Sequence, residues 1–286
     1  MNMFGRGLVS VLCGIVLSSV VAAEPPPNEP FVAASFNVRV KMNKDNSPNT
    51  WEERLPRCRA LIRQIDADVI GLQEPLFFQV EALVKDSEYD YIGGGRADFK
   101  QEGEFSCILY RRSRMECLAG GTFGLSETPD VPGVRSWNSA HPRIATWGLF
   151  RDRRTGREFV FCNTHLDHKS EDARREGIKL LVAQTGKYAA GKPLMIAGDF
   201  NARPGSDTYK TAASLLRDTK AVSETLHGGS GKTFHGWGRP GVIDEPIDYI
   251  FVSPEFRVLS HRTDNTLFDG QFASDHYPVV VKMMLE

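Results

Sequence analysis

Short apolar runs that end in a carboxylate, amide or imidazole recur along this chain, and they constrain its fold more than any other feature. The clearest is Leu-Met-Ile-Ala-Gly-Asp-Phe-Asn, which follows Lys192 and Pro193 and places Asp199 and Asn201 at its end. An apolar run of about four to eight residues between Pro and Gly is typical of a buried strand. Polar groups at the carboxyl end of such a strand lie at the sheet rim, where open α/β sheets bind ligands. Taken alone, Gly-Asp-Phe-Asn is equally well interpreted as a turn.

The same patterns predict alternating strands and helices in one domain, without a repeat or a clear linker. Strands are predicted over 31–40, 68–72, 105–110, 115–118, 144–150, 158–163, 192–199, 247–252 and 279–283. Helical spacing of apolar residues predicts helices over 50–65, 77–84, 171–190 and 206–216. The glycine run 93–95 precedes no helical pattern, so we interpret it as a loop rather than a phosphate cradle. The long loop 119–141 and the residues after it carry Trp137, Asn138, His141 and Arg143, which could line a substrate cleft.

The first 23 residues differ from the rest and read as a secretory signal peptide. Arg6 precedes an apolar run from Leu8 to Val21, and Val21-Ala22-Ala23 is a small-residue cleavage signature. An uncleaved membrane anchor is the alternative, although the run is short for a bilayer span. We therefore expect a signal peptide over 1–23, a stiff lead-in over 24–30 and a mature domain over 31–286. This predicts a secreted or periplasmic monomer with no integral membrane association after cleavage.

The net charge bears on nucleic-acid binding, and the cysteines bear on disulfide formation. The formal net charge is −1, so the chain is no polycation, and binding to long nucleic acid would need a local basic patch. The densest basic cluster lies around Thr155-Gly156, and we interpret it as a solvated hairpin turn. Its members are Arg151, Arg153, Arg154 and Arg157. In an oxidising compartment Cys58, Cys107, Cys117 and Cys162 could form two disulfides, in any of three pairings.

Most of the apolar runs stop at side chains that bind metal ions or move protons. These are Asn37, Glu74, His165, Asp199, Asn201, Asp248, Asp275 and His276. Carboxylates that meet at one rim repel each other unless a cation neutralises them, and oxygen ligands suit Mg²⁺ or Mn²⁺ better than Zn²⁺. A carboxylate and histidine pair beside such a metal supplies what phosphoester hydrolysis needs, which is an activated water and stabilised phosphoryl oxygens.

These residues stand in motifs that resemble the endonuclease/exonuclease/phosphatase superfamily of deoxyribonuclease I-like hydrolases, in particular its secreted bacterial members. The resemblance covers residues 31–282 and rests on six segments in order. They are Ser-Phe-Asn37, Gly-Leu-Gln-Glu74, Asn-Thr-His165-Leu, Gly-Asp199-Phe-Asn201, Ile-Asp248-Tyr-Ile-Phe and Ser-Asp275-His276. It implies a four-layer α/β sandwich, in which two packed mixed β-sheets are flanked by helices and the active site lies at one end of the sheets.

The resemblance also implies a role for each residue. Glu74 would be the principal metal ligand, supported by Asn37 and Asp275. Asp199 would position or deprotonate the attacking water, and Asn201 would orient the water or the phosphate. His276 would face the scissile phosphate with Asp248 as its carboxylate partner. His165 would stabilise the transition state or assist the leaving group, and Tyr110 resembles a tyrosine near the phosphate in some relatives.

Several alternatives stay open at this point. Tyr110 is equally well explained by core packing, and Asn37 or Asp248 could be a satisfied buried polar group. His165 and His168 stand three residues apart and raise the alternative of zinc. Asp167 and His168 depart from the usual continuation of the Thr-His-Leu motif, so they either help to select substrate or cap the following helix.

The resulting prediction is a Mg²⁺- or Mn²⁺-dependent phosphoesterase that hydrolyses a phosphodiester or phosphomonoester by in-line attack of a metal-activated water. The candidate substrate-binding residues are Tyr110, Trp137, Arg143 and His168. A secreted nuclease acting on DNA or RNA is the alternative enzyme, and a binding module without catalysis is the alternative of another class.

Overall fold

The computed structural model describes Met1 and residues 28–286, in which two β-sheets pack face to face. Residues 2–27, with nearly all of the predicted signal peptide and most of the lead-in, lie outside the described residues. Among the described helices, none combines the length and the apolar character that a bilayer span requires.

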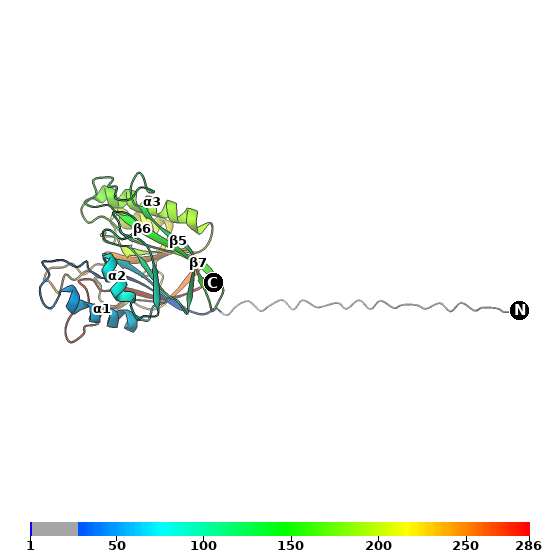
Figure 1. Cartoon of the computed structure of the whole chain (residues 1–286), viewed down its shortest axis with the longest axis horizontal. Helices are drawn as coiled ribbons and strands as arrows, with labels where there is room; N and C mark the ends of the chain where they lie inside the picture. Colours follow the sequence, from blue (N-terminus) through cyan, green and yellow to red (C-terminus); the bar gives the residue numbers. More distant parts are fainter. Residues whose placement is uncertain (2–27) are drawn as a thin grey trace.

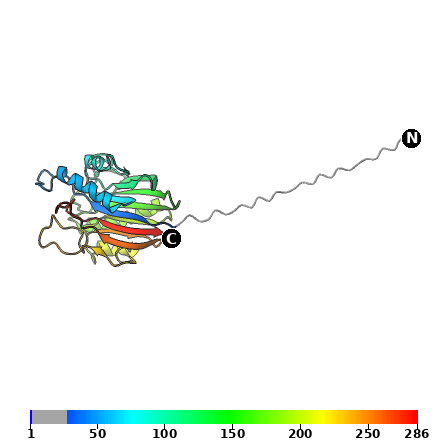
Figure 2. The same ribbon diagram turned by 90° about the horizontal axis from the view of Figure 1, so that it is seen from below.

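The first sheet has seven strands in the order β10-β12-β13-β1-β2-β4-β3. In chain order they are β1 (Phe31–Asn37), β2 (Val69–Gln73), β3 (Tyr89–Ile92), β4 (Ile108–Arg111), β10 (Gly228–Gly229), β12 (Phe256–Thr263) and β13 (Val279–Leu285). The sheet is mixed, since β1 runs parallel to β2 but antiparallel to β13. Figure 2 shows β1 and β13, blue and red, side by side. The first and last strands of the domain are therefore neighbours within this sheet.

The second sheet has six strands in the order β5-β6-β7-β8-β11-β9. They are β5 (Met115–Gly124), β6 (Ile144–Asp152), β7 (Glu158–His165), β8 (Leu194–Asp199), β9 (Arg217–Asp218) and β11 (Asp248–Val252). This sheet is also mixed, because β7 and β8 are parallel whereas β8 and β11 are antiparallel.

In residues 28–286, four helices cover the outer faces of the two sheets. Two of them, α1 (Trp51–Ile65) and α2 (Phe77–Val84), pack on the first sheet, and α3 (Glu171–Ala189) covers the second on the far side of the sandwich (Figure 1). The short helix α4 (Asp207–Leu215) packs beside α3. The predicted four-layer α/β sandwich is therefore confirmed.

Burial on both faces explains why the central strands are almost entirely apolar. In β1, Phe31 and Ala33 point into the core between the sheets, whereas Ala34 and Phe36 point into the core beneath α1 and α2. A third core lies between the second sheet and α3. A strand that is covered on both faces has no exposed side on which polar residues could alternate, so it reads as a continuous apolar run.

Strand register brings the predicted polar groups to one edge of the sandwich. Asn37 pairs with Gln73 across β1 and β2, and His165 pairs with Asp199 across β7 and β8. The antiparallel neighbour β11 starts at Asp248, directly opposite Asp199. Gly198 permits this arrangement, because a Cβ there would lie 2.2 Å from the carbonyl oxygen of Thr164 on β7.

The structure differs from the sequence prediction in several elements. The first strand ends at Asn37 rather than at residue 40, because Arg39 adopts left-handed backbone with φ of 61°. The strand β5 continues to Gly124, and the polar-rich β12 was not predicted. The basic hairpin turn is confirmed, since β6 and β7 pair antiparallel on either side of it, and Arg151, Arg153 and Arg154 pair with glutamates there. No disulfide forms among the described cysteines, which are distributed over all three apolar cores.

Candidate active site

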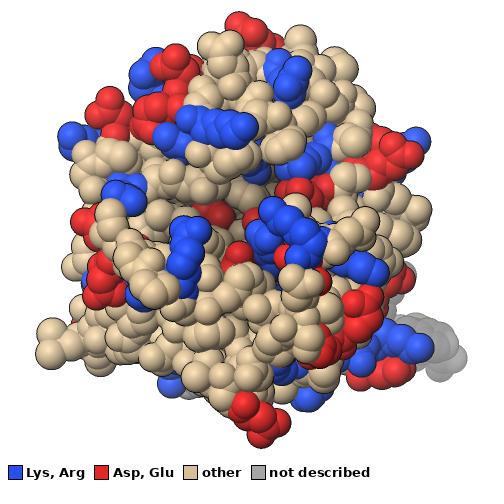
Figure 3. All heavy atoms as spheres, turned by 90° about the vertical axis from the view of Figure 1, so that its left-hand side faces the viewer, with Lys and Arg blue, Asp and Glu red and all other residues tan. Residues whose placement is uncertain are grey.

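A cleft of about 450 Å³ opens where the two sheets end, and most of the predicted site residues line it or lie directly beneath it. Figure 3 looks onto this end of the molecule and shows acidic atoms deep in a central hollow, with lysine and arginine side chains around its rim. The described lining residues include Arg39, Glu74, Arg143, His165, His168, Asp199, Asn201, Asp275 and His276.

Asp199, Asp248 and His276 form a buried cluster at the base of the cleft. Nδ1 of His276 lies 2.9 Å from Oδ2 of Asp248, and Nε2 of His276 lies 3.9 Å from Oδ2 of Asp199. Burial disfavours the imidazolium, but the carboxylates of Asp248, Asp199 and Asp275, with Asp248 contributing most, together outweigh burial and raise the pKa of His276 to about 10. At neutral pH the ring therefore carries a proton on each nitrogen, with Nδ1 donating to Asp248 and Nε2 directed toward Asp199.

Asn37 connects this cluster to Glu74. Its amide nitrogen donates to Oε1 of Glu74 at 2.9 Å and to Oδ2 of Asp199 at 3.1 Å, while its oxygen accepts from the backbone of Arg39. The second oxygen of Glu74 accepts from the backbone of Val40. Burial opposes ionisation of Glu74, yet the donors from Val40 and Asn37 prevail and lower its pKa. Asn37 thus orients two carboxylates, and its own place as a metal ligand stays a prediction.

Asp275 lines the same cleft and lies next to Arg39, a residue that the sequence prediction missed. The Arg39 guanidinium lies 3.5 Å from both Asp275 and Asp45. Burial raises the pKa of Asp275, and Glu74 adds to the shift by like-charge repulsion. Arg39 follows a strand-end asparagine by two residues, which is the one sequence signal that could have drawn attention to it.

His165 and Asn201 meet beside Asp199. The Asn201 amide nitrogen donates to the carbonyl of Leu166 at 3.1 Å and lies 3.0 Å from Nε2 of His165, so that ring nitrogen accepts. Burial, with Arg143 nearby, lowers the pKa of His165 well below its ordinary value. The ring is therefore neutral at neutral pH and carries its proton on Nδ1. His168 is bonded instead to Arg143, and the group of possible metal ligands found among the described residues contains neither histidine.

Three residues of the site hold strained backbone. Arg39, Glu74 and Asn201 all hold left-handed backbone, with φ of 61°, 74° and 47°. A non-glycine residue in this region costs on the order of 1 kcal/mol or more, and such residues cluster at functional sites.

The donor set fits a divalent metal ion. The ligand atoms of Asp199, Asp248 and His276 lie within 4.8 Å of one another, which is consistent with such an ion, although His276 could be a ligand only with a neutral ring. Burial, followed by repulsion from Asp248, raises the pKa of Asp199 to about 7. A raised pKa shows that a buried carboxylate lacks a nearby cation to stabilise its negative charge. Hard cations such as Mg²⁺ or Mn²⁺ could supply that charge, since they prefer oxygen ligands.

Two of the predicted substrate-binding residues lie away from the cleft. Tyr110 pairs with Val69 at the start of β2, whereas the site lies beyond the end of β2, and its ring packs against Phe150. The prediction for Tyr110 rests on its resemblance to a tyrosine near the phosphate in some relatives. Because β4 runs antiparallel to β2, the start of β4 lies toward the site, and the end that carries Tyr110 lies away from it. Trp137 does not line the cleft, and its carbonyl accepts from Ser170 at the start of α3.

Arg143 and His168 do line the cleft, and so does His141, which the sequence analysis named with Arg143 as a residue that could line it. Arg96 and Glu104 also line the cleft and were not predicted as site residues. Arg96 directly follows the glycine run, which forms a loop as predicted, and this loop carries it to the cleft. Nothing in the local sequence marks Arg96 or Glu104 as site residues, because their approach depends on how the loop folds back.

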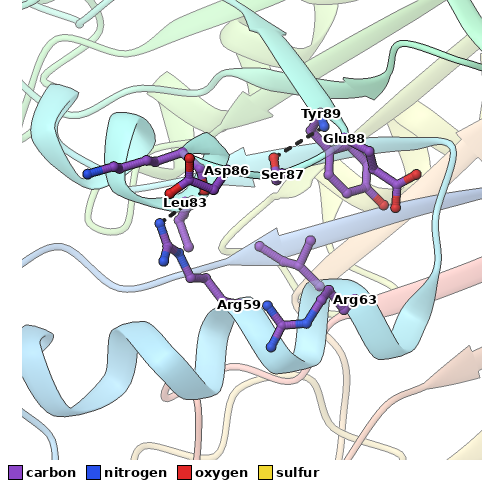
Figure 4. Close-up of a pocket in the computed structure, with 9 residues that line it drawn as sticks. Arg59, Arg63, Leu83, Asp86, Ser87, Glu88 and Tyr89 are labelled. Atoms are coloured by element: carbon purple, nitrogen blue, oxygen red, sulfur yellow. Dashed lines mark hydrogen bonds between the residues drawn. The ribbon is translucent and has the colours of Figure 1, made fainter.

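A second hollow of about 420 Å³ lies between α1 and the turn after α2 (Figure 4). Two of its charged side chains are engaged in local structure. Arg59 donates to the carbonyls of Ala82 and Lys85, and Glu88 pairs with Arg111. The hollow therefore shows no set of groups suited to catalysis, and the cleft is the candidate site.

Solved structures resemble this chain over nearly its whole length. An endonuclease/exonuclease/phosphatase from Bacteroides vulgatus shares 35% identity at a TM-score of 0.86, covering 90% of this chain and 100% of that one. A mannosyl-6-phosphatase from Bacteroides thetaiotaomicron shares 32% identity at a TM-score of 0.83, covering 88% and 99%.

Curated relatives are more distant in sequence. Nocturnin from Drosophila melanogaster is 26% identical over 275 residues, which span 81% of this chain and 41% of that protein. The chain thus spans about two fifths of the length of the curated relatives that it matches first. A sequence profile of the Endonuclease/Exonuclease/phosphatase family matches residues 34–276. The protein belongs to the endonuclease/exonuclease/phosphatase family.

Proposed function

We propose that the protein is a metal-dependent phosphoesterase that hydrolyses a compact phosphoester by in-line attack of water. The observation that carries this proposal is the meeting of Asp199 with the Asp248–His276 pair at the base of the cleft. A carboxylate beside a doubly protonated imidazole provides a base for the attacking water and a cationic donor for a phosphoryl oxygen.

Asp199 is the proposed general base. Its Oδ2 atom accepts from Asn37 and lies 3.5 Å from Nε2 of His165 and 3.9 Å from Nε2 of His276. Burial raises the pKa of this carboxyl to about 7, which makes it a stronger base than an exposed aspartate while part of it stays ionised at neutral pH. A water molecule held against this oxygen can give up its proton as it attacks phosphorus.

His276 is the proposed donor to the phosphate. Asp248 holds the ring by Nδ1 and keeps it cationic, so the Nε2–H bond is free to point at a phosphoryl oxygen. Negative charge grows on the phosphoryl and leaving oxygens during hydrolysis, and a fixed cation at that point stabilises the transition state more than the substrate.

Glu74 and Asp275 are the proposed metal ligands, with Asn37 orienting Glu74. A bound Mg²⁺ or Mn²⁺ would supply charge neutralisation and Lewis acidity at the phosphate. Arg39 balances part of the charge of Asp275 and lines the same cleft, where it can contact a phosphate oxygen. Asn201 orients the water or the phosphate, and its amide is itself held by Leu166 and His165. Assistance to the leaving group by His165 would require a proton on its Nε2.

A phosphomonoester of a small alcohol is the proposed substrate class, with a nuclease as the second candidate. The mannosyl-6-phosphatase likeness favours phosphorylated sugars, whereas likeness to an exoribonuclease subunit favours nucleic acid. The cleft volume is in the range of a single small-molecule site. The basic hairpin is compensated by glutamates, so it offers no strong patch for a polyanion.

Export through the signal peptide predicted over residues 1–23 is also part of the proposal. Expression of the full-length chain, followed by fractionation and N-terminal sequencing, tests it. A mature protein that begins at residue 24 supports export, and an uncleaved chain in the cytoplasmic fraction contradicts it.

Assay of the purified domain against a panel of esters tests the proposed function. The panel contains nitrophenyl phosphate, bis-nitrophenyl phosphate, hexose phosphates, single- and double-stranded DNA, RNA and a phospholipid, each with Mg²⁺ or Mn²⁺ and with chelator. Chelator-sensitive release of phosphate from a monoester supports the proposal. A polymer-preferring activity that falls steeply with salt would favour the nuclease. If none of the esters in the panel is hydrolysed, the result would favour a binding module without catalysis.

A further inference from the structure

One side of the cleft, next to His165, is built from side chains that have no part in the proposed reaction. This arginine–histidine wall consists of Arg96, Glu104, His141, Arg143 and His168. We propose that the wall binds the uncharged, hydroxyl-bearing alcohol of a phosphomonoester, such as a hexose, and that it does not bind a second phosphate or a nucleobase. This inference rests on the proposed function and assigns the substrate's alcohol to named residues.

The charges of the wall are compensated within the protein. Arg96 donates to both oxygens of Glu104, each at 2.8 Å, and Arg143 lies 3.3 Å from Oδ2 of the fully buried Asp167. An incoming anion would have to compete with carboxylates that are already held against both guanidinium groups. The wall is therefore a poor site for a second phosphate, in contrast to a patch of unpaired arginines.

The two histidines present neutral rings. Burial, reinforced by the arginines, lowers the pKa of His141 and of His168. A guanidinium can only donate, so the 2.9 Å contact from Arg143 requires Nδ1 of His168 to accept, and the ring proton then lies on Nε2. The rings stack with centroids 5.8 Å apart. The pair thus offers flat apolar surface together with a fixed N–H donor.

The wall offers both hydrogen-bond donors and acceptors, and this combination suits hydroxyl groups. A hydroxyl both donates and accepts, and a sugar carries several in fixed directions. Arg96 and Arg143 retain N–H bonds beyond those used in their ion pairs, and the Glu104 oxygens beside them can accept. A polyol can therefore satisfy both kinds of group at once, which a purely anionic ligand cannot do.

The wall offers a nucleobase no phenyl or indole ring, and its flat surfaces are the small imidazole rings of His141 and His168 and the two guanidinium groups. Among the described residues that line the cleft, Phe234 is the aromatic side chain apart from the histidines, and it packs against His276 with ring centroids 5.0 Å apart. Its ring therefore belongs to the catalytic pair. Base recognition commonly stacks the base on aromatic rings, so the wall favours a saturated ring.

Asp167 holds the wall in place from behind. Its Oδ2 atom accepts from the backbone of Ala140 at 2.9 Å, and its Oδ1 atom accepts from the backbone of Lys169 and Ser170. These bonds fix the loop that carries His141 to the end of β7 and to the start of α3. Both interpretations of Asp167 and His168 from the sequence then apply, since Asp167 organises the start of the helix and His168 faces the substrate.

Hydrolysis of matched esters tests the wall. The substrates are mannose 6-phosphate, glucose 6-phosphate, the hydroxyl-free cyclohexylmethyl phosphate and adenosine 5′-phosphate. We expect kcat/KM for at least one hexose phosphate to exceed that for the hydroxyl-free ester by roughly 10- to 100-fold, since hydrogen bonds to charged groups contribute to binding at that level. His168→Phe, which keeps a flat ring, should remove most of this preference. Arg135→Gln, on the same loop as His141 but outside the cleft, is the control and should keep it.

Binding to the Asp199→Asn protein, measured by calorimetry, separates failure of the wall from failure of the proposed function. We expect the hexose phosphate to bind about tenfold or more tightly than the hydroxyl-free ester, because only the hexose can pair with the wall. If the wild-type protein hydrolyses neither ester, the proposed function fails, and this binding ratio still decides about the wall. Equal binding of the two esters, a preference for the nucleotide, or an equal loss for both esters in His168→Phe would overturn the inference.

Discussion

Asp248 and His276 form a hydrogen bond of 2.9 Å between Oδ2 and Nδ1, at a place where both side chains are buried. The bond joins the start of β11 in the second sheet to the segment before β13 in the first sheet. It therefore links the two halves of the sandwich at their common end. The carboxylate keeps the imidazole cationic although burial works against the charge.

Replacing Asp248 by Asn should remove this cation. We expect turnover to fall roughly 10²-fold or more, because His276 would lose both its orientation and its positive charge. The imidazole pKa, followed by NMR, should drop from the alkaline range toward or below its ordinary value. Asp218→Asn serves as the control, since Asp218 is a buried carboxylate on β9 that bonds Tyr209 outside the cleft. An unchanged pKa for His276 in Asp248→Asn would contradict the assigned pairing.

Metal binding should stabilise the fold, and its removal should reverse the effect. Mn²⁺ at one hundred times its dissociation constant adds about 2.7 kcal/mol to the free energy of unfolding if one site binds the native state alone. We expect a higher Tm with Mn²⁺ or Mg²⁺ and a return to the starting value with chelator. Glu74→Gln should abolish the increase, and the exposed Glu102→Gln should retain it. An equal increase in both variants would place the metal elsewhere.

Arg54 connects the chain segments next to Asn37 and Asp275, two of the predicted metal ligands. The side chain is fully buried and donates to the carbonyls of Asn49, Val38, Arg39 and Ala273. Arg54→Met leaves these acceptors without a donor, so we expect a loss of about 3 kcal/mol of stability, measured by urea unfolding. Arg54→Lys keeps a charge and three donors and should lose less. Equal stability of the Met and Lys variants would show that the hydrogen bonds contribute little.

Two buried histidines should make the fold sensitive to acid. Burial lowers the pKa of His235 to about 4 and that of His261 to about 3. Since both values lie below the ordinary histidine pKa, the unfolded chain binds protons first, and stability falls as pH decreases from about 6.5 toward 4. Each ring contributes a slope of roughly 1.4 kcal/mol per pH unit at most.

The acid effect is tested by unfolding His261→Asn at a series of pH values. Thr219 donates to the carbonyl of Ile250 and therefore accepts from Nδ1 of His261, a bond that an asparagine amide can imitate. We expect the variant to lose less stability than the wild type between pH 6 and pH 4, with similar stability at pH 8. Parallel curves for the two proteins would show that His261 does not carry this part of the acid response.

Residues at the ends of continuous apolar strands were predictable from the sequence, whereas residues that reach the cleft on loops were not. Asp199 and Glu74 follow strands buried on both faces, so their position at the rim follows from the strand pattern itself. Arg96 comes to the cleft through a loop that folds back to pair Gly95 with Phe105. Local sequence does not encode such a contact, because it depends on tertiary packing.

Strand direction set a second limit on what the sequence could show. Tyr110 and Asp199 both stand at strand ends, yet β4 and β8 present opposite ends to the cleft. The sequence pattern locates the ends of a strand but not which end faces the site. The strand β12, which lies between β10 and β13, escaped prediction for another reason, because polar residues such as Arg257, Ser260 and Arg262 interrupt its apolar pattern.

Hydrolysis of the ester panel by the wild-type protein and by Asp199→Asn, with Mn²⁺ and with chelator, tests the proposed chemistry most directly. We expect metal-dependent release of phosphate from a monoester by the wild type, its loss with chelator, and a drop of roughly 10²-fold or more in a variant that stays folded by circular dichroism. Near-full activity of Asp199→Asn, or hydrolysis by the wild type that persists with chelator, would contradict the proposed mechanism.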